Sequence, residues 1–290
     1  MPLSDAQVRI FHKEGVLVAE SIFDDADLAP IIDEYAAWLT ERANTLRAEG
    51  RLADLYPDMP FARRTALLHA QAPEITEHMD IATVLGPATF AFLRHPRLLA
   101  ALELLIGAEI TCNPIQHVRA KPPADSTGAR DGFHDVPWHQ DAATMSNEAD
   151  NSDIVTCWIP LVDTTRHNGC LEVIPHAWRG GYIAHGPGPR IASGHLPAEA
   201  PRPAPVRRGG VVFMHRYTPH RSTPNLSDHT RWSIDLRYQP TGTPTGRPFH
   251  PSFVVQSRQQ PAEVFTDYAA WCQTWRDALA ATPEMRSHRT

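Results

Sequence analysis

Two histidines, an aspartate and an arginine are the residues of this chain whose types and spacing point most directly to chemistry. His139 and Asp141 are separated by a single residue, His220 lies far downstream, and Arg231 follows eleven residues later. Two imidazoles and one carboxylate can occupy one face of an octahedral iron and leave the opposite positions open. An arginine nearby can hold the far carboxylate of a keto acid through a bidentate ion pair. The set suggests an enzyme that uses iron(II), 2-oxoglutarate and O2.

The triplet His139-Gln140-Asp141 places both candidate ligands on one side of an extended chain. Side chains alternate along a strand, so His139 and Asp141 face one way while Gln140 faces the other. The triplet alone is weak evidence in a chain with sixteen histidines. Trp138 before it and β-rich sequence after it favour a metal site.

The stretch from Arg231 to Tyr238 alternates cleanly between polar and apolar residues. Its polar positions are Arg231, Ser233, Asp235 and Arg237, and its apolar positions are Trp232, Ile234, Leu236 and Tyr238. One interpretation is an ordinary strand with a solvated side. The other makes the polar side the lining of a barrel mouth, where Arg231 and Ser233 receive the anionic end of a cosubstrate. Alternation alone does not separate the two.

Composition restricts the class of protein. The chain has 290 residues, of which 42% are hydrophobic and 21% charged, and its net charge is −6. This length can form one large core or two small ones. The acidic balance argues against a nucleic-acid partner, because proteins that bind nucleic acids are usually basic.

The cysteines and the N-terminus bear on location. Four scattered cysteines, Cys112, Cys157, Cys170 and Cys272, form no CxxC pair, which is typical of reduced, buried thiols. The first fifteen residues do not resemble a secretory signal. No apolar run reaches the ~20 residues that span a bilayer. We therefore expect a cytoplasmic protein without a membrane partner.

Residues 1–108 are expected to be mainly helical. A capping box at Ser4 and Gln7 predicts a short helix that ends at Gly15. The segments that should follow are a brief strand at Gly15–Ala19 and helices at Leu28–Ala48, Ala62–Ala72 and Pro96–Ile106. A last helix is expected within 260–282, from about Pro261 to Ala280, with an aromatic stripe on one side.

Residues 109–240 change character and become a series of short β-rich segments. The expected strands are Ile110–Arg119, Val136–Gln140, Asp153–Leu161, Cys170–Ile174, Val211–Met214 and Arg231–Tyr238. Such a series predicts a closed or double-sheet antiparallel core. We find no boundary within 1–290 and expect a single domain, with the helices packed against the β core. The proline-rich stretch Gly186–Arg208 is either a functional lid or a stiff surface excursion, and Ala124–Gly132 is a second expected loop.

The sequence resembles the phytanoyl-CoA dioxygenase family of iron(II)/2-oxoglutarate oxygenases. The matching stretches are WHQD (138–141), WIPLVDTTRHNGCLEVIPHAW (158–178), GGVVFMH (209–215) and HRSTPNLSDHTRWSIDLRY (220–238). Their order and spacing fit the family pattern over about half of the chain. The resemblance implies a β-rich α+β fold whose core is a double-stranded β-helix, a cupin-like jelly roll, flanked by N-terminal and C-terminal helices.

The resemblance also implies roles for individual residues. His139, Asp141 and His220 would be the iron ligands. Arg231 would pair with the C5 carboxylate of 2-oxoglutarate, and the other expected cosubstrate contacts are Ser222, Ser233, Trp158 and His117.

The remaining histidines are weaker candidates. His215 ends an apolar strand and is expected near the edge of the core, and His229 lies in a polar turn and is expected to be solvated. His134 and His176 are interpreted as loop residues, although either could face a substrate.

Asp141 also bears on the reaction outcome. Related iron halogenases have a small residue at this position, which leaves room for chloride on the metal. The carboxylate here therefore predicts hydroxylation of a small organic molecule, with release of succinate and CO2, and no chlorination. The same hydrogen abstraction could serve desaturation, ring closure or epimerisation.

Two alternatives from other classes remain open. One is a non-catalytic cupin-like protein that binds a metal or ligand without consuming 2-oxoglutarate. The other is a zinc-type hydrolase that uses the same two histidines and one carboxylate. Arg231 speaks against the first, because a binding protein needs no anchor for a keto acid. The second lacks a separate general base at a recognisable spacing.

Overall fold

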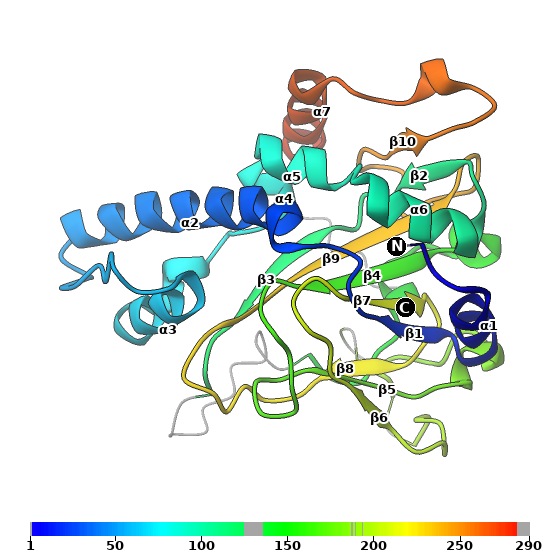
Figure 1. The fold of residues 1–290 in the computed structure, drawn as a ribbon, viewed down its shortest axis with the longest axis horizontal. Helices are drawn as coiled ribbons and strands as arrows, with labels where there is room; N and C mark the ends of the chain where they lie inside the picture. The colour runs from blue at the N-terminus through cyan, green and yellow to red at the C-terminus, as the bar shows by residue number, and fades with distance from the viewer. Residues whose placement is uncertain (1, 125–135, 187, 189, 193, 283–290) are drawn as a thin grey trace.

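The protein folds into two antiparallel sheets with most of its helices packed on one side (Figure 1). A computed structural model describes residues 2–124, 136–186, 188, 190–192 and 194–282. The large sheet has seven strands in the order β1-β7-β4-β9-β2-β10, with β3 also paired to β9, and the small sheet has the order β6-β5-β8. The strands are β1 (Val16–Ala19), β2 (Ile110–Cys112), β3 (His117–Lys121), β4 (Val155–Pro160), β5 (Leu171–Val173), β6 (Arg202–Ala204), β7 (Val211–His215), β8 (His220–Ser222), β9 (Arg231–Pro240) and β10 (Phe253–Gln256).

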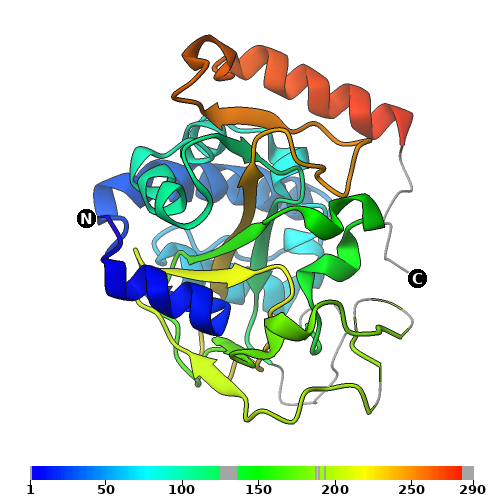
Figure 2. The same ribbon diagram turned by 90° about the vertical axis from the view of Figure 1, so that its right-hand side faces the viewer.

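Several helices cover the face of the large sheet that points away from the small one. In Figure 1, α2, α5 and α6 lie above the large sheet and the small sheet lies below it; Figure 2 shows α7 along the top of the molecule. The α-helices are α1 (Asp5–Glu14), α2 (Asp25–Ala48), α3 (Phe61–Gln71), α4 (Ile81–Val84), α5 (Pro87–Phe92), α6 (Pro96–Ile106) and α7 (Tyr268–Ala281). The short 3-10 turns are η1 (Pro73–Thr76), η2 (Asp141–Thr144), η3 (Asn147–Asn151), η4 (Ala177–Gly180) and η5 (Pro261–Glu263).

Strand β9 shows how the alternating sequence builds two different surfaces. Its apolar residues join the main core beneath the helices, where Trp232 stacks on Phe61 with ring centroids 4.7 Å apart and on Tyr35 at 6.5 Å. Its polar residues face the space between the two sheets and are also buried. The interpretation of β9 as a strand with a solvated side is therefore wrong, because its polar side is buried. The role of that side as the lining of a barrel mouth that receives a cosubstrate stays a prediction.

The first helix follows its capping signals. Ser4 and Gln7 form the predicted capping box, and Gly15 ends the helix with a φ of 75°. That conformation favours glycine, and a Cβ at this position would overlap the indole of Trp178. The chain then turns directly into β1, which pairs with β7.

Several predicted boundaries are wrong. The large sheet extends beyond 109–240, because β1 lies before this range and β10 lies after it. The expected strand Ile110–Arg119 is two strands, interrupted where Asn113 accepts a hydrogen bond from the backbone N–H of Ile115. The expected strand Val136–Gln140 makes only an isolated bridge, between His139 and His220.

Three further expectations concern loops and the last helix. The final helix begins at Tyr268, where Asp267 caps it, rather than at Pro261. The Gly186–Arg208 stretch contains β6, and its Ile191 forms an isolated bridge with His185 just before it. Its interpretation as a lid or as a surface excursion stays a prediction. The expected loop Ala124–Gly132 lies, apart from its first residue, outside the described residues. Among the helices that the structure describes, none is long and apolar enough to cross a membrane.

His215 is predicted to make stability depend on pH. It ends β7, packs against Trp178 at 4.6 Å, and accepts a hydrogen bond on Nδ1 from the backbone N–H of Tyr217. Burial, then the charge of Arg216, lowers the pKa of His215 to about 4. The unfolded chain therefore binds a proton at higher pH than the folded one, and stability should fall as the pH drops from about 6.5 to about 4.

Denaturant unfolding of metal-free protein across this range measures the effect. His215→Asn, which keeps an acceptor near Nδ1, should remove about 2 kcal/mol of the pH-dependent loss. The exposed His78 provides the matched control, His78→Asn, which should leave the pH profile unchanged. An unaltered profile in His215→Asn would contradict the prediction.

Candidate metal centre and cosubstrate site

The two histidines of the candidate centre are held side by side by the backbone. The N–H of His139 donates to the carbonyl of His220 at 3.0 Å, and the N–H of His220 donates to the carbonyl of His139 at 2.9 Å. Asp141 follows at the start of η2, and its Oδ1 lies 3.9 Å from the Nε2 atom of each histidine. The predicted set His139, Asp141 and His220 is thus brought together, with ligand atoms within 4.8 Å of one another.

Each histidine presents Nε2 to the centre. Nδ1 of His139 faces the carbonyl oxygen of Pro137 at 2.9 Å, and Nδ1 of His220 faces that of Thr218 at 3.0 Å. A carbonyl oxygen only accepts, so Nδ1 carries the proton and the Nε2 lone pair is available to a metal. Burial, then the nearby His220, lowers the pKa of His139 to about 3, which keeps this imidazole neutral.

Asp141 is oriented by two donors that the sequence analysis did not identify. Thr156 on β4 donates its hydroxyl to Oδ2, and Arg237 on β9 donates Nη2–H to Oδ1 at 2.6 Å. Burial would raise the pKa of Asp141, but the charge of Arg237 and the two histidines hold it below its usual range. Oδ1 keeps a second lone pair for a metal. Arg237 lies on the same polar face of β9 as Arg231, and this alternation is the feature of the sequence that could have pointed to Arg237.

This donor set suits a divalent transition metal. Two neutral imidazole nitrogens and one carboxylate oxygen meet in a buried site, and each ligand has a hydrogen-bonding partner that fixes its orientation. The residues therefore fit iron(II) in a facial arrangement.

Arg237 is predicted to tune metal binding through Asp141. Arg237→Gln removes the charge that orients the ligand oxygen, so the Kd for iron(II), measured by anaerobic titration, should rise about 10–100-fold. Arg237→Lys, which keeps the charge, should lose less. Arg221→Gln is the matched control, because Arg221 pairs with Glu172 on the small sheet. Unchanged iron affinity in a folded Arg237→Gln protein would contradict the prediction.

Arg231 carries a buried guanidinium whose hydrogen-bond donors are only partly used. It is 3% exposed, donates Nη1–H to Ser233 Oγ at 3.0 Å, and lies over the ring of Trp158 at 5.2 Å. No carboxylate of the described residues lies within ion-pair distance of it, and its Nε has no hydrogen-bond partner. Burial lowers its pKa to about 10. A buried cation of this kind is stabilised by an anionic ligand.

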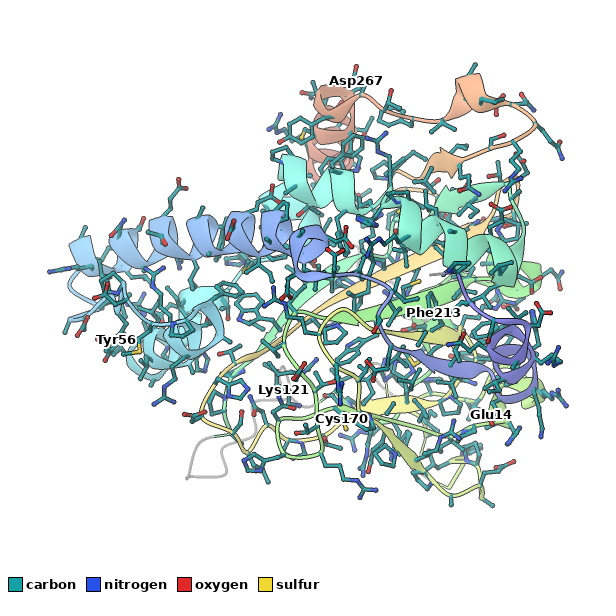
Figure 3. The ribbon with its side chains drawn as sticks, viewed as in Figure 1. Glu14, Tyr56, Lys121, Cys170, Phe213 and Asp267 are labelled. Carbon is teal, nitrogen blue, oxygen red and sulfur yellow. The ribbon has the colours of Figure 1, made fainter. Side chains whose placement is uncertain are left out.

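Ser222 and Lys121 lie beside this arginine. Lys121 on β3 is paired in register with Arg231 on β9, and its Nζ donates to Ser222 Oγ at 3.0 Å. Ser222 comes from β8 of the small sheet, so the two sheets meet at this point; Figure 3 labels Lys121 there, close to Cys170. Lys121 was not assigned a role from the sequence, although it is one of only two lysines in the chain.

His117 does not lie beside Arg231, Lys121 and Ser222. It lies four residues before Lys121 on β3, opposite Asp235, and its Nδ1 pairs with Asp80 at 2.8 Å. A cosubstrate contact for His117 stays a prediction.

The other histidines lie apart from the candidate centre. His176 is exposed and His229 is half-buried beside Asp228, while His134 lies outside the described residues. His215 is packed against Trp178, near the core edge as predicted. The only metal-like cluster found among the described residues is His139, Asp141 and His220.

Comparisons with known proteins place this chain in a family. The family model for phytanoyl-CoA dioxygenase (PhyH) matches residues 11–233. The rat phytanoyl-CoA dioxygenase domain-containing protein 1 is 33% identical over 145 residues, which cover 41% of this chain and about half (48%) of the rat protein. The ectoine dioxygenase of Bordetella parapertussis is 25% identical over 256 residues, covering 81% of this chain and 75% of that enzyme.

A solved structure shares the fold. The epimerase SnoN, determined in complex with Fe3+, α-ketoglutarate and nogalamycin RO, superposes with a TM-score of 0.58 at 19% identity and covers 83% of this chain and 86% of its own. The family match extends from α1 to the start of β9 and includes all three residues of the candidate centre. This chain belongs to the phytanoyl-CoA dioxygenase family.

Proposed function

We propose that this protein is an iron(II)- and 2-oxoglutarate-dependent oxygenase that hydroxylates a C–H bond of a small organic molecule. The observation that carries the proposal is the buried cation Arg231, which has no carboxylate partner in the described part of the chain. It accompanies a site formed by His139, Asp141 and His220. Neither a structural metal site nor a hydrolase requires such an anion position.

The spacing along β8 supports 2-oxoglutarate as the anion. His220 and Ser222 lie on the same face of this strand, two residues or about 7 Å apart. This is close to the separation between the two ends of a five-carbon dicarboxylate. The keto acid end would lie at the metal beside His220, and the far carboxylate would reach Ser222 and Arg231.

The chain's own residues would then have separate tasks. His139, Asp141 and His220 hold the metal, and Thr156 and Arg237 orient Asp141. Arg231, Ser222 and Ser233 bind the far carboxylate, and Trp158 packs against Arg231. When bound, iron(II) with 2-oxoglutarate and O2 would supply the oxidation, with release of succinate and CO2.

We further infer that the two sheets form the double-stranded β-helix, or jelly roll, expected from the resemblance. Both sheets contribute residues to the candidate site, because β8 carries His220 and Ser222 while β9 carries Arg231. Two of the relatives are named as dioxygenases and the structural neighbour as an epimerase, so the outcome of hydrogen abstraction is the finer part of the proposal.

Uncoupled turnover tests the proposal without knowledge of the substrate. Protein loaded with iron(II) and supplied with 2-oxoglutarate and O2 should release succinate, and zinc-loaded protein should not. Succinate formation at the same rate with either metal would favour the binding-protein or hydrolase alternatives. So would a lack of succinate when iron is bound and O2 is present.

A further inference from the structure

A second arginine lies on the inner face of the large sheet, next to the residues already assigned. Arg119 is in β3 and is paired in register with Ser233 of β9, so both side chains lie on the same face of the sheet. Its Nε–H donates to Oδ2 of Asp235 at 2.6 Å. Arg119 thus lies between the Arg231 end of β9 and the Asp141-bound Arg237.

The hydrogen bond between Arg119 and Asp235 leaves an acceptor oxygen of the aspartate and the Nη donors of the arginine without partners among the described residues. Oδ1 of Asp235 is buried and has no hydrogen-bond partner. The pair uses only the Nε edge of the guanidinium, and no residue of the described ranges accepts a hydrogen bond from either Nη atom of Arg119. The arginine side chain is 39% exposed, whereas that of Asp235 is 9% exposed. Asp235 therefore holds the guanidinium at Nε, while both Nη atoms of this partly exposed side chain lack a partner among the described residues.

A purely structural role explains this geometry poorly. Strands β3 and β9 are already joined by backbone pairing from His117 to Lys121. A structural Arg–Asp pair gains most from bidentate contact, which is not made here. The neighbouring pair of Asp80 with His117 differs, because both Asp80 oxygens are used: Oδ2 by His117 and Oδ1 by backbone N–H groups.

We propose that the Nη edge of Arg119 binds a carboxylate group of the substrate, so that the enzyme acts on a small carboxylic acid. The planar guanidinium matches a carboxylate through two parallel N–H···O bonds, whereas a neutral amide offers one acceptor. The position suits a substrate rather than 2-oxoglutarate, because Arg231 and Ser222 already supply the cosubstrate end. This inference rests on the proposed function and names its substrate class.

Binding of matched acid and amide probes tests the inference. Iron(II)–2-oxoglutarate protein is prepared without oxygen, and its visible keto-acid band is followed as cyclohexanecarboxylate, 4-isopropylbenzoate or decanoate is added, each beside its primary amide. At least one acid should bind about tenfold or more tightly than its amide. Arg119→Gln should abolish that preference, and Arg119→Lys should retain part of it.

Two controls separate the possible failures. Arg221→Gln removes an arginine of similar exposure that pairs with Glu172 on the small sheet, and it should leave the acid preference unchanged. The Kd for 2-oxoglutarate should change less than about twofold in Arg119→Gln. The inference is wrong if no acid binds better than its amide, if the preference survives in Arg119→Gln, or if that variant loses 2-oxoglutarate itself. Absence of the keto-acid band in the unaltered protein would instead refute the proposed function.

Discussion

Replacing Asp141 with asparagine is expected to abolish iron-dependent conversion of 2-oxoglutarate to succinate. The carboxamide keeps the shape of the side chain but removes the only negative charge among the three candidate ligands. The loss should exceed the roughly 10–100-fold typical of residues that contact a metal only through its ligands. Succinate release in the iron-loaded variant, compared with the unaltered protein, measures the effect.

Folding must be checked in the same protein. Asp141→Asn leaves the buried Arg237 without its carboxylate, which can cost about 3–5 kcal/mol of stability. Thermal unfolding and the substitutions His139→Ala and His220→Ala, which leave the Asp141–Arg237 pair in place, separate loss of fold from loss of metal. Full activity in a folded Asp141→Asn protein would show that the ligand set is wrong, and a chlorinated product from the unaltered enzyme would contradict hydroxylation.

Replacing Arg231 with glutamine is expected to raise the Kd for 2-oxoglutarate about 100-fold, because truncating a buried charge-assisted contact costs about 2–5 kcal/mol. Iron affinity should remain unchanged, since Arg231 contacts Ser233 and Trp158 and makes no hydrogen bond or ion pair to the three candidate metal ligands. Anaerobic binding of 2-oxoglutarate to iron-loaded protein gives the value.

Arg231→Lys provides the conservative variant. A lysine keeps the charge but cannot form the bidentate pair, so an intermediate Kd is expected. If both variants bound 2-oxoglutarate as tightly as the unaltered protein, the anion site would belong to another part of the chain.

The sequence predicted the centre better than the sheets that position it. His139, Asp141, His220 and Arg231 are recognisable because their residue types, order and spacing are tied to the chemistry. The expected strand at Val136–Gln140 does not form, yet a single backbone bridge between His139 and His220 is enough to bring the two candidate ligands side by side. Site geometry here depends on a few backbone contacts more than on a regular element.

The residues that support the ligands could not be predicted from local pattern. Thr156 and Asp141 are fifteen residues apart, and Arg237 and Asp141 are ninety-six residues apart, so their contacts depend on how β4 and β9 pair. Alternation along β9 showed that Arg231 and Arg237 share a face, but it did not show that this face is buried. Likewise, β10 is a strand because it pairs with β2, and no local sequence pattern specifies that pairing.

The most direct test of the account is an anaerobic titration of the iron(II)-loaded protein with 2-oxoglutarate. The visible charge-transfer band of a chelated keto acid should appear on titration. At the same 2-oxoglutarate concentrations it should be absent from the Arg231→Ala protein with iron still bound. An iron-loaded protein that shows no band, or an Arg231→Ala protein that shows the same band at the same concentrations, would contradict this expectation.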